Sequence, residues 1–205
     1  MPHQMHVFKG STPQREFKIG IAIPCYKKDQ GFLDTCLEAI ENLNPQPYVT
    51  VVNLNWASSL KEARKQLFEY IFKNEKCDVI LQNSVDFYLM ADILKHVRRN
   101  RIVSFNPLCL RRYALSFSLY HLLFPKMGWS GCYSMPIEYW NCYKHRFDGY
   151  DSSILRQVGR FKYDFHIPFI YYNLRPYRKS SVQEFLKTKP LFKRVLWRMA
   201  RMGIG

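Results

Sequence analysis

The sequence predicts a single α/β domain in which helices flank a mostly parallel central sheet. A chain of 205 residues, 47% of them hydrophobic, is long enough to bury one core. Short apolar and β-branched runs alternate along it with segments of helical periodicity. This alternation is typical of parallel strands joined by crossover helices, and ligands of such folds bind at the carboxyl ends of the strands.

The first half of the chain shows this alternation most clearly. The expected strands are residues 17–23, which Pro24 brings to an end, 48–54 and 79–82. The expected helices are residues 31–43, 59–74 and 91–98, where apolar residues recur at three- and four-residue steps. Each strand is thus followed by a helix, as a parallel sheet requires.

The second half of the chain is less regular, and residues 108–124 have no clear assignment. Residues 102–105 and 165–172 are expected to be strands, and residues 128–136 a glycine-punctuated turn followed by a strand. Helices are expected at residues 137–143 and 151–158. The pattern therefore predicts one domain over residues 17–189, with halves at 17–95 and 96–189.

The two ends of the chain are expected to lie outside this domain. Residues 1–16 are polar and contain glycine and proline, which predicts a flexible arm. Residues 190–205 are predicted to be a basic amphipathic tail, because Phe192, Leu196 and Met199 share one helical face. This helix has three candidate partners: an anionic membrane, another protein, and the chain's own sheet.

Charge and cysteine content limit the class of protein. The net charge of +15 favours binding to polyanions, namely nucleic acid, an anionic membrane or phosphorylated ligands. The six cysteines form no Cys-x-x-Cys pair and have no histidine at zinc spacing, so they are predicted to be reduced thiols of a cytoplasmic protein. An apolar run of about 18 residues, which a membrane-spanning helix requires, is absent from the sequence.

The most informative segment follows the predicted strand at residues 79–82. Ser84 and Asp86 stand two residues apart, so that two oxygens project from one side of an extended turn. Hard divalent cations such as Mn²⁺ and Mg²⁺ bind to oxygen ligands of this kind, and a cation there could bridge a diphosphate. The alternative is that both residues cap the following helix.

Other motifs follow in order along the chain. They are Ile-Pro-Cys-Tyr at 23–26, Val-Val-Asn-Leu-Asn at 51–55, Glu-Ala-Arg-Lys at 62–65, Gly-Trp-Ser-Gly at 128–131 and Phe-Asp-Gly-Tyr-Asp at 147–151. Together with Ser84-Val85-Asp86, they resemble the motifs of the family-two nucleotide-sugar glycosyltransferases with a GT-A (Rossmann-like) fold. The chain departs from the family at Ser84, where an aspartate is usual, and at Asn53.

The resemblance implies a nucleotide-binding half and an acceptor half. In the first half, Pro24 and Tyr26 would line the base pocket, Asn53 and Asn55 would meet the base, and Arg64 would reach the diphosphate. An amide carries both a donor and an acceptor for a base edge, and the planar fork of an arginine matches two phosphate oxygens.

The resemblance also implies the residues that carry the chemistry. Asp86, with the weaker ligand Ser84, would hold Mn²⁺ or Mg²⁺, and Trp129 and Ser130 would form a floor under the sugars. Asp151 matches the catalytic base, although it also stands where a helix cap is expected. Arg175 and Arg178 would close over the donor from a loop. The resemblance also implies a further metal ligand near the last strand, for which Asn173 and His166 are the two candidates.

The implied function is an inverting, metal-dependent glycosyltransferase. It would take a sugar from a nucleoside diphosphate sugar, a UDP-sugar by default, and pass it to a glycan, protein or lipid acceptor. The short length resembles that of small viral enzymes. Two alternatives stay open: a pseudoenzyme that only binds the nucleotide sugar, and a basic nucleic-acid-binding protein, although no specific nucleic-acid motif is present. The expected location is cytoplasmic, with peripheral membrane contact as a variant.

Overall fold

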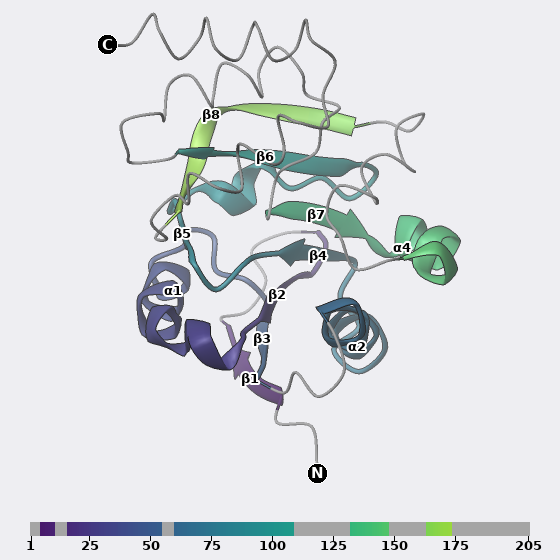
Figure 1. Ribbon diagram of the computed structural model, residues 1–205. Helices are drawn as coiled ribbons and strands as arrows, with labels where there is room; N and C mark the ends of the chain where they lie inside the picture. Colours follow the sequence, from purple (N-terminus) through teal and green to yellow (C-terminus); the bar gives the residue numbers. More distant parts are fainter. Residues whose placement is uncertain (1–4, 11–15, 55–59, 109–131, 148–162, 174–205) are drawn as a thin grey trace, which may run out of the picture.

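A computed structural model describes residues 5–10, 16–54, 60–108, 132–147 and 163–173. In this part of the chain, eight strands form one sheet in the order β1-β3-β2-β4-β7-β6-β8-β5 (Figure 1). The strands are β1 (Met5–Lys9), β2 (Ile19–Pro24), β3 (Val49–Asn53), β4 (Val79–Gln82), β5 (Phe87–Leu89), β6 (Ile102–Leu108), β7 (Tyr133–Pro136) and β8 (Tyr163–Asn173).

The sheet is mixed, with one direction in the majority. Strands β2, β3, β4, β6 and β8 run one way, and β1, β5 and β7 run the other way. The predicted α/β class with a mostly parallel sheet is therefore confirmed. The described helices are α1 (Leu33–Glu41), α2 (Leu60–Lys73), α4 (Ile137–Tyr143) and the 3₁₀ helices η1 (Lys27–Phe32), η2 (Ile93–His96) and η4 (Lys144–Arg146).

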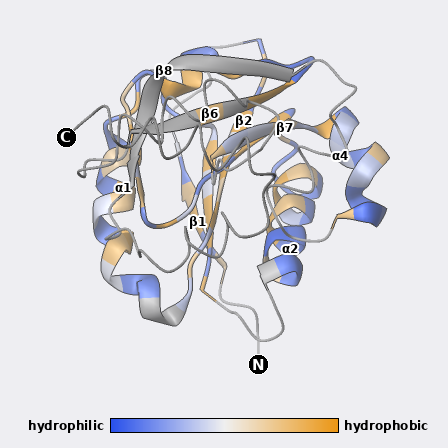
Figure 2. Cartoon of the chain, turned by 45° about the horizontal axis from the view of Figure 1, so that its top comes forward, coloured by the Kyte–Doolittle hydropathy of each residue, from blue (hydrophilic) through white to orange (hydrophobic). Residues whose placement is uncertain are grey.

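Two hydrophobic cores lie on the two faces of the sheet. Figure 1 shows α1 on one face and α2 with α4 on the other. Along β2, Ile21 and Ile23 are buried in the core on the α1 side, whereas Ala22 is buried on the α2 side. Successive strand residues alternate between faces, so each strand feeds both cores. The helices combine hydrophobic and hydrophilic residues, as Figure 2 shows.

Helix α2 approaches β2 closely because Gly20 has no side chain. A Cβ atom at this position would lie 2.6 Å from the Cγ2 atom of Ile71 and 3.1 Å from the Sγ atom of Cys77. Glycine therefore allows the contact between the helix and the strand. This contact allows the last part of α2 to pack closely on the sheet.

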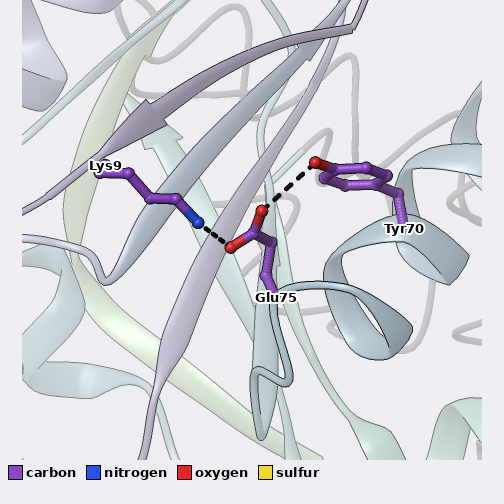
Figure 3. Close-up of polar contacts among 3 residues, drawn as sticks. All are labelled: Lys9, Tyr70 and Glu75. Carbon is purple, nitrogen blue, oxygen red and sulfur yellow. Dashed lines mark hydrogen bonds and ion pairs between the residues drawn. The ribbon is translucent and has the colours of Figure 1, made fainter.

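The flexible arm predicted for residues 1–16 is wrong for residues 5–9, which form β1. This strand pairs antiparallel with β3 at the edge of the sheet. Its last residue, Lys9, makes an ion pair with the buried Glu75, which also accepts a 3.3 Å hydrogen bond from the Tyr70 hydroxyl (Figure 3). This strand is stabilised by partners far away in the sequence, so its own five residues show only a weak pattern from which a strand could be predicted.

The helix predicted at residues 91–98 is also different in the structure. Only Ile93–His96 are helical, as the 3₁₀ turn η2, and the preceding residues Phe87–Leu89 form β5. Strand β5 pairs antiparallel with β8, about eighty residues further along. The predicted helix is thus reduced to a short 3₁₀ turn, and the strand before it was not predicted because its partner lies far along the sequence. The predicted helix at 151–158 and the tail at 190–205 lie outside the described residues.

The described cysteines are thiols, and most of them are buried. The described cysteines, at positions 25, 36, 77, 132 and 142, form no disulfide, and all but Cys142 are buried. Cys109 lies outside the described residues. Among the described helices, none combines the length and the apolar character that crossing a bilayer requires.

Candidate functional site

The carboxyl ends of β2, β3 and β4 meet at one edge of the sheet. The parallel register aligns Pro24 with Asn53 and Ala22 with Gln82. Backbone hydrogen bonds continue past the strand ends, from the Cys25 N–H to the Asn53 carbonyl at 3.0 Å and from the Asn83 N–H to the Ala22 carbonyl at 2.9 Å. Three motifs that are far apart in sequence are thus brought together where ligands of this fold class bind.

The turn after β4 orients Ser84 and Asp86. The Phe87 N–H donates to the Ser84 carbonyl at 3.0 Å and closes the turn, while the side chains of Val85 and Phe87 are buried in the core on the α1 side. The Ser84 hydroxyl donates to Oδ1 of Asp86 at 2.5 Å. The turn therefore places these two oxygen-bearing side chains side by side, as the sequence spacing predicts.

The donor set of this turn fits a hard cation. Asp86 is only 7% exposed and supplies a carboxylate, and Ser84 supplies a hydroxyl within hydrogen-bonding distance. Oxygen ligands of this kind suit Mn²⁺ and Mg²⁺. Within the described ranges, no group of three His, Cys, Asp or Glu side chains lies close enough to hold a metal. A cation at Asp86 would therefore take most of its remaining ligands from a bound phosphate group or from water.

Asn53 and Arg64 lie together on the α2 side of this edge. The Asn53 amide, which is fully buried, donates to the carbonyl of Ala63 at 3.4 Å. Ala63 immediately precedes Arg64, which is 5% exposed. A buried guanidinium has a strong preference for an anionic partner, because its charge is costly to remove from water. The fold thus brings an amide, and the segment that carries an arginine, to the same side of the carboxyl edge.

The segment after β2 contributes Tyr26 and a residue that sequence reasoning missed. The Asp29 N–H donates to the Tyr26 carbonyl at 2.8 Å, at the start of η1. The Asp29 side chain is only 5% exposed, so the edge carries a second buried carboxylate besides Asp86. A polar Lys-Lys-Asp-Gln stretch resembles an exposed loop, so the sequence contains no signal for this burial.

The thiols near this edge are poor nucleophiles. Burial, together with the nearby Asp29 carboxylate, raises the pKa of Cys25 to about 11. Burial likewise raises the pKa of Cys36 to about 12. Both thiols therefore stay protonated at neutral pH, and thiolate chemistry at this site is excluded.

Strand β8 brings Asn173 beside the turn that carries Asp86. Asn173 stands opposite Phe87 in the antiparallel register, whereas His166 stands opposite Phe105 in the β6 pairing. Of the two residues considered as a further metal ligand, Asn173 therefore has the backbone position adjacent to Asp86. The sequence alone could not decide this, because the choice depends on the register of β8.

The remaining predicted site residues lie outside the described residues: Asn55, Trp129, Ser130, Asp151, Arg175 and Arg178. The structure does describe Phe147, which immediately precedes the acidic motif. Its ring stacks on Phe68 of α2 at 5.9 Å between centroids and meets Trp140 of α4 edge-on at 5.3 Å. Phe147 therefore packs on the α2 side of the sheet, whereas the acidic residues that follow it lie outside the described residues.

Comparison with known proteins identifies the fold. No protein-family model matches the sequence, and no curated protein matches it. A solved structure of a glycosyltransferase involved in the glycosylation of the major capsid of PBCV-1 is similar, with 9% identity and a TM-score of 0.52, over 84% of this chain and 100% of that chain. A solved structure of the galactosyltransferase LgtC, in complex with donor and acceptor sugar analogs, has 11% identity over 86% of this chain and 99% of that chain. Its TM-score of 0.42 is too low to show a common fold.

The similarity at a TM-score of 0.52 shows the fold alone, because the sequence identity is low. The chain has the GT-A-like fold of glycosyltransferases, as the order of its sequence motifs predicts.

Proposed function

We propose that this chain is an inverting glycosyltransferase that takes a sugar from a nucleoside diphosphate sugar, by default a UDP-sugar. The acceptor is a glycan, a protein or a lipid, and the cofactor is Mn²⁺ or Mg²⁺. The observation that carries the proposal is the convergence of Asn53, Arg64, Ser84 and Asp86 at the carboxyl edge of a GT-A-like sheet. This convergence of amide, guanidinium and carboxylate matches the chemistry of a nucleoside diphosphate.

Each residue has a role that follows from its chemistry. The Asn53 amide would hydrogen-bond a pyrimidine edge beside Pro24 and Tyr26, and Arg64 would bind the diphosphate through two parallel hydrogen bonds. Asp86 and Ser84 would hold the cation, with Asn173 as the neighbouring candidate ligand. The bound cation would neutralise the charge that develops on the diphosphate leaving group.

The acceptor half of the proposal depends on residues outside the described ranges. Asp151 would take the proton from the acceptor hydroxyl during in-line attack. Asn55 would contact the base, Trp129 and Ser130 would lie under the sugars, and Arg175 and Arg178 would approach the diphosphate from the segment that follows β8. A cytoplasmic location, a viral source and peripheral membrane contact through residues 190–205 belong to the same proposal.

A thermal-shift panel of nucleoside diphosphates with and without Mn²⁺ tests the proposal. A ligand that binds the native state raises the melting temperature, and a concentration of 100 times Kd adds about 2.7 kcal/mol of stability. We expect UDP with Mn²⁺ to raise the melting temperature more than either component alone. The matched control is UMP with Mn²⁺, which carries the same base but no diphosphate.

Incubation with UDP-sugars then separates transfer from binding. Release of UDP together with an inverted sugar product supports the enzyme. Nucleotide binding without any release would support the pseudoenzyme instead. A chain that no nucleoside diphosphate stabilises, but that binds DNA with a steep dependence on salt, would overturn the proposal in favour of nucleic-acid binding.

A further inference from the structure

A buried asparagine supports the turn that carries Ser84 and Asp86. Asn83 is fully buried directly after β4. Its Nδ2 atom donates to the Phe87 carbonyl at 3.4 Å, across the turn, and to Sγ of Cys36 in α1 at 3.5 Å. Its backbone N–H donates to the Ala22 carbonyl of β2 at 2.9 Å. One residue thus joins the base of the turn to a strand, to a helix and to the far side of the turn.

The amide of Asn83 is costly to keep at this position. Within the described part of the chain, its Oδ1 atom receives no hydrogen bond, although the residue has no exposure to solvent. A buried polar atom without a partner destabilises the native state, and this cost offsets what the two Nδ2 hydrogen bonds of the same amide contribute. Fold stability alone therefore does not account for an asparagine here, which points to a role in the site above it.

The geometry of the turn shows what that role is. Asn83 reaches Phe87, which follows Asp86 directly, while Val85 and Phe87 are anchored in the core on the α1 side. The two residues that flank Asp86 are therefore held in the core, and the carboxylate of Asp86 has little freedom to move away from Ser84. A metal-binding side chain that is already held in place loses less conformational entropy when the cation binds.

We propose that Asn83 is a positioning residue that holds Asp86 in the orientation for binding a metal–diphosphate complex, at the expense of fold stability. The inference rests on the proposed function for its ligand. The order that Asn83 gives to the turn is measurable without any ligand.

The test compares Asn83→Leu, which has a similar shape, with the wild type and with Thr50→Val. Thr50→Val also removes a buried polar group, but it lies within β3 and away from the turn. Amide hydrogen exchange of the full chain, resolved to the peptide that spans residues 83–87, reports the order of the turn. Titration calorimetry with UDP and Mn²⁺ reports binding, and thermal unfolding reports stability.

For Asn83→Leu we expect exchange in the turn to be about tenfold faster or more, while the melting temperature falls by less than about 5 °C or rises. Affinity for UDP with Mn²⁺ should fall by about 10- to 100-fold, the usual effect of losing a residue that orients a metal ligand. Thr50→Val should leave both the turn and the affinity unchanged.

Unchanged exchange in the turn of Asn83→Leu would overturn the proposal. Faster exchange in β2 and α1 to the same extent as in the turn, with a matching loss of melting temperature, would also overturn it, because this is the result of general destabilisation. If the wild type itself binds no UDP with Mn²⁺, the proposed function fails. The exchange rates then still decide whether Asn83 orders the turn.

Discussion

At the scale of single residues, the site is a set of polar side chains held at the ends of buried strands. Ser84 and Asp86 were predictable because their two-residue spacing after an apolar run has a direct geometric meaning. Asp29 and Asn83 were not predictable, because no local pattern marks the burial of a polar residue in η1, and because Asn83 is buried against Cys36 of α1, far away in the sequence. The choice of Asn173 over His166 likewise depends on the register of β8.

The acidic motif after Phe147 leads to a prediction for Asp151. Asp151→Asn keeps the shape of the side chain but removes the proton acceptor, so turnover should fall by about 10²- to 10⁴-fold. Binding of UDP with Mn²⁺ should be retained, because the proposed donor site lies at Asn53, Arg64 and Asp86. Steady-state kinetics together with calorimetry on the same sample separate the two effects. Near-normal turnover, or a product with retained anomeric configuration, would rule out this role.

At the scale of elements, the end of α2 shows how a helix can stop without glycine. The Cys77 N–H donates to the Ile71 carbonyl at 3.3 Å, and Lys76 adopts a φ of 52°. A residue in the left-handed conformation just beyond the end of a helix is usually glycine. The sequence predicts helix α2 over residues 59–74 to within a residue, but it contains no glycine to mark the cap.

Replacing Lys76 tests this ending. Lys76→Gly should raise the free energy of unfolding by about 0.5–1 kcal/mol, because glycine has no Cβ to strain the left-handed conformation. Lys73→Gly, in the last turn of α2, is the matched control and should lower it by about 1 kcal/mol, the cost of glycine within a helix. Urea unfolding measures both. Destabilisation by both variants to the same extent would contradict the left-handed ending.

At the scale of the whole molecule, the sequence predicted the class of fold and the order of the central strands and helices, but it missed strands β1 and β5. The order in which the strands pair could not be predicted from local patterns. Strands β1, β5 and β7 run against the majority, and each pairs with a strand far away in the sequence. Short antiparallel strands carry little local signal because their stability comes from their partners. Local patterns therefore predicted the central β3-β2-β4 unit better than the edges.

Buried thiols make the stability of the whole domain sensitive to alkaline pH. Burial raises the pKa of Cys25 to about 11 and of Cys36 and Cys77 to about 12, from 9.0. The unfolded chain loses these protons first, so stability is complete below about pH 9 and falls as the pH rises through these values. Each thiol contributes a slope of up to about 1.4 kcal/mol per pH unit.

Urea unfolding at about pH 8 and about pH 10 measures this loss. The wild type should lose more free energy of unfolding between the two values than Cys36→Ala, which lacks one of the thiols. The cost of the smaller side chain cancels, because only the difference between the two pH values is compared. If both proteins lose the same free energy of unfolding between the two pH values, Cys36 does not contribute to the pH dependence of stability.

The central claim is that the carboxyl edge of the sheet binds a nucleoside diphosphate with a cation at Asp86. Titration calorimetry of UDP, with and without Mn²⁺, on the wild type, Asp86→Asn and the exposed control Asp92→Asn tests it most directly. The account predicts that Mn²⁺ strengthens UDP binding in the wild type and in Asp92→Asn, and that this gain disappears in Asp86→Asn while the protein stays folded. The same gain from Mn²⁺ in all three proteins would contradict the account.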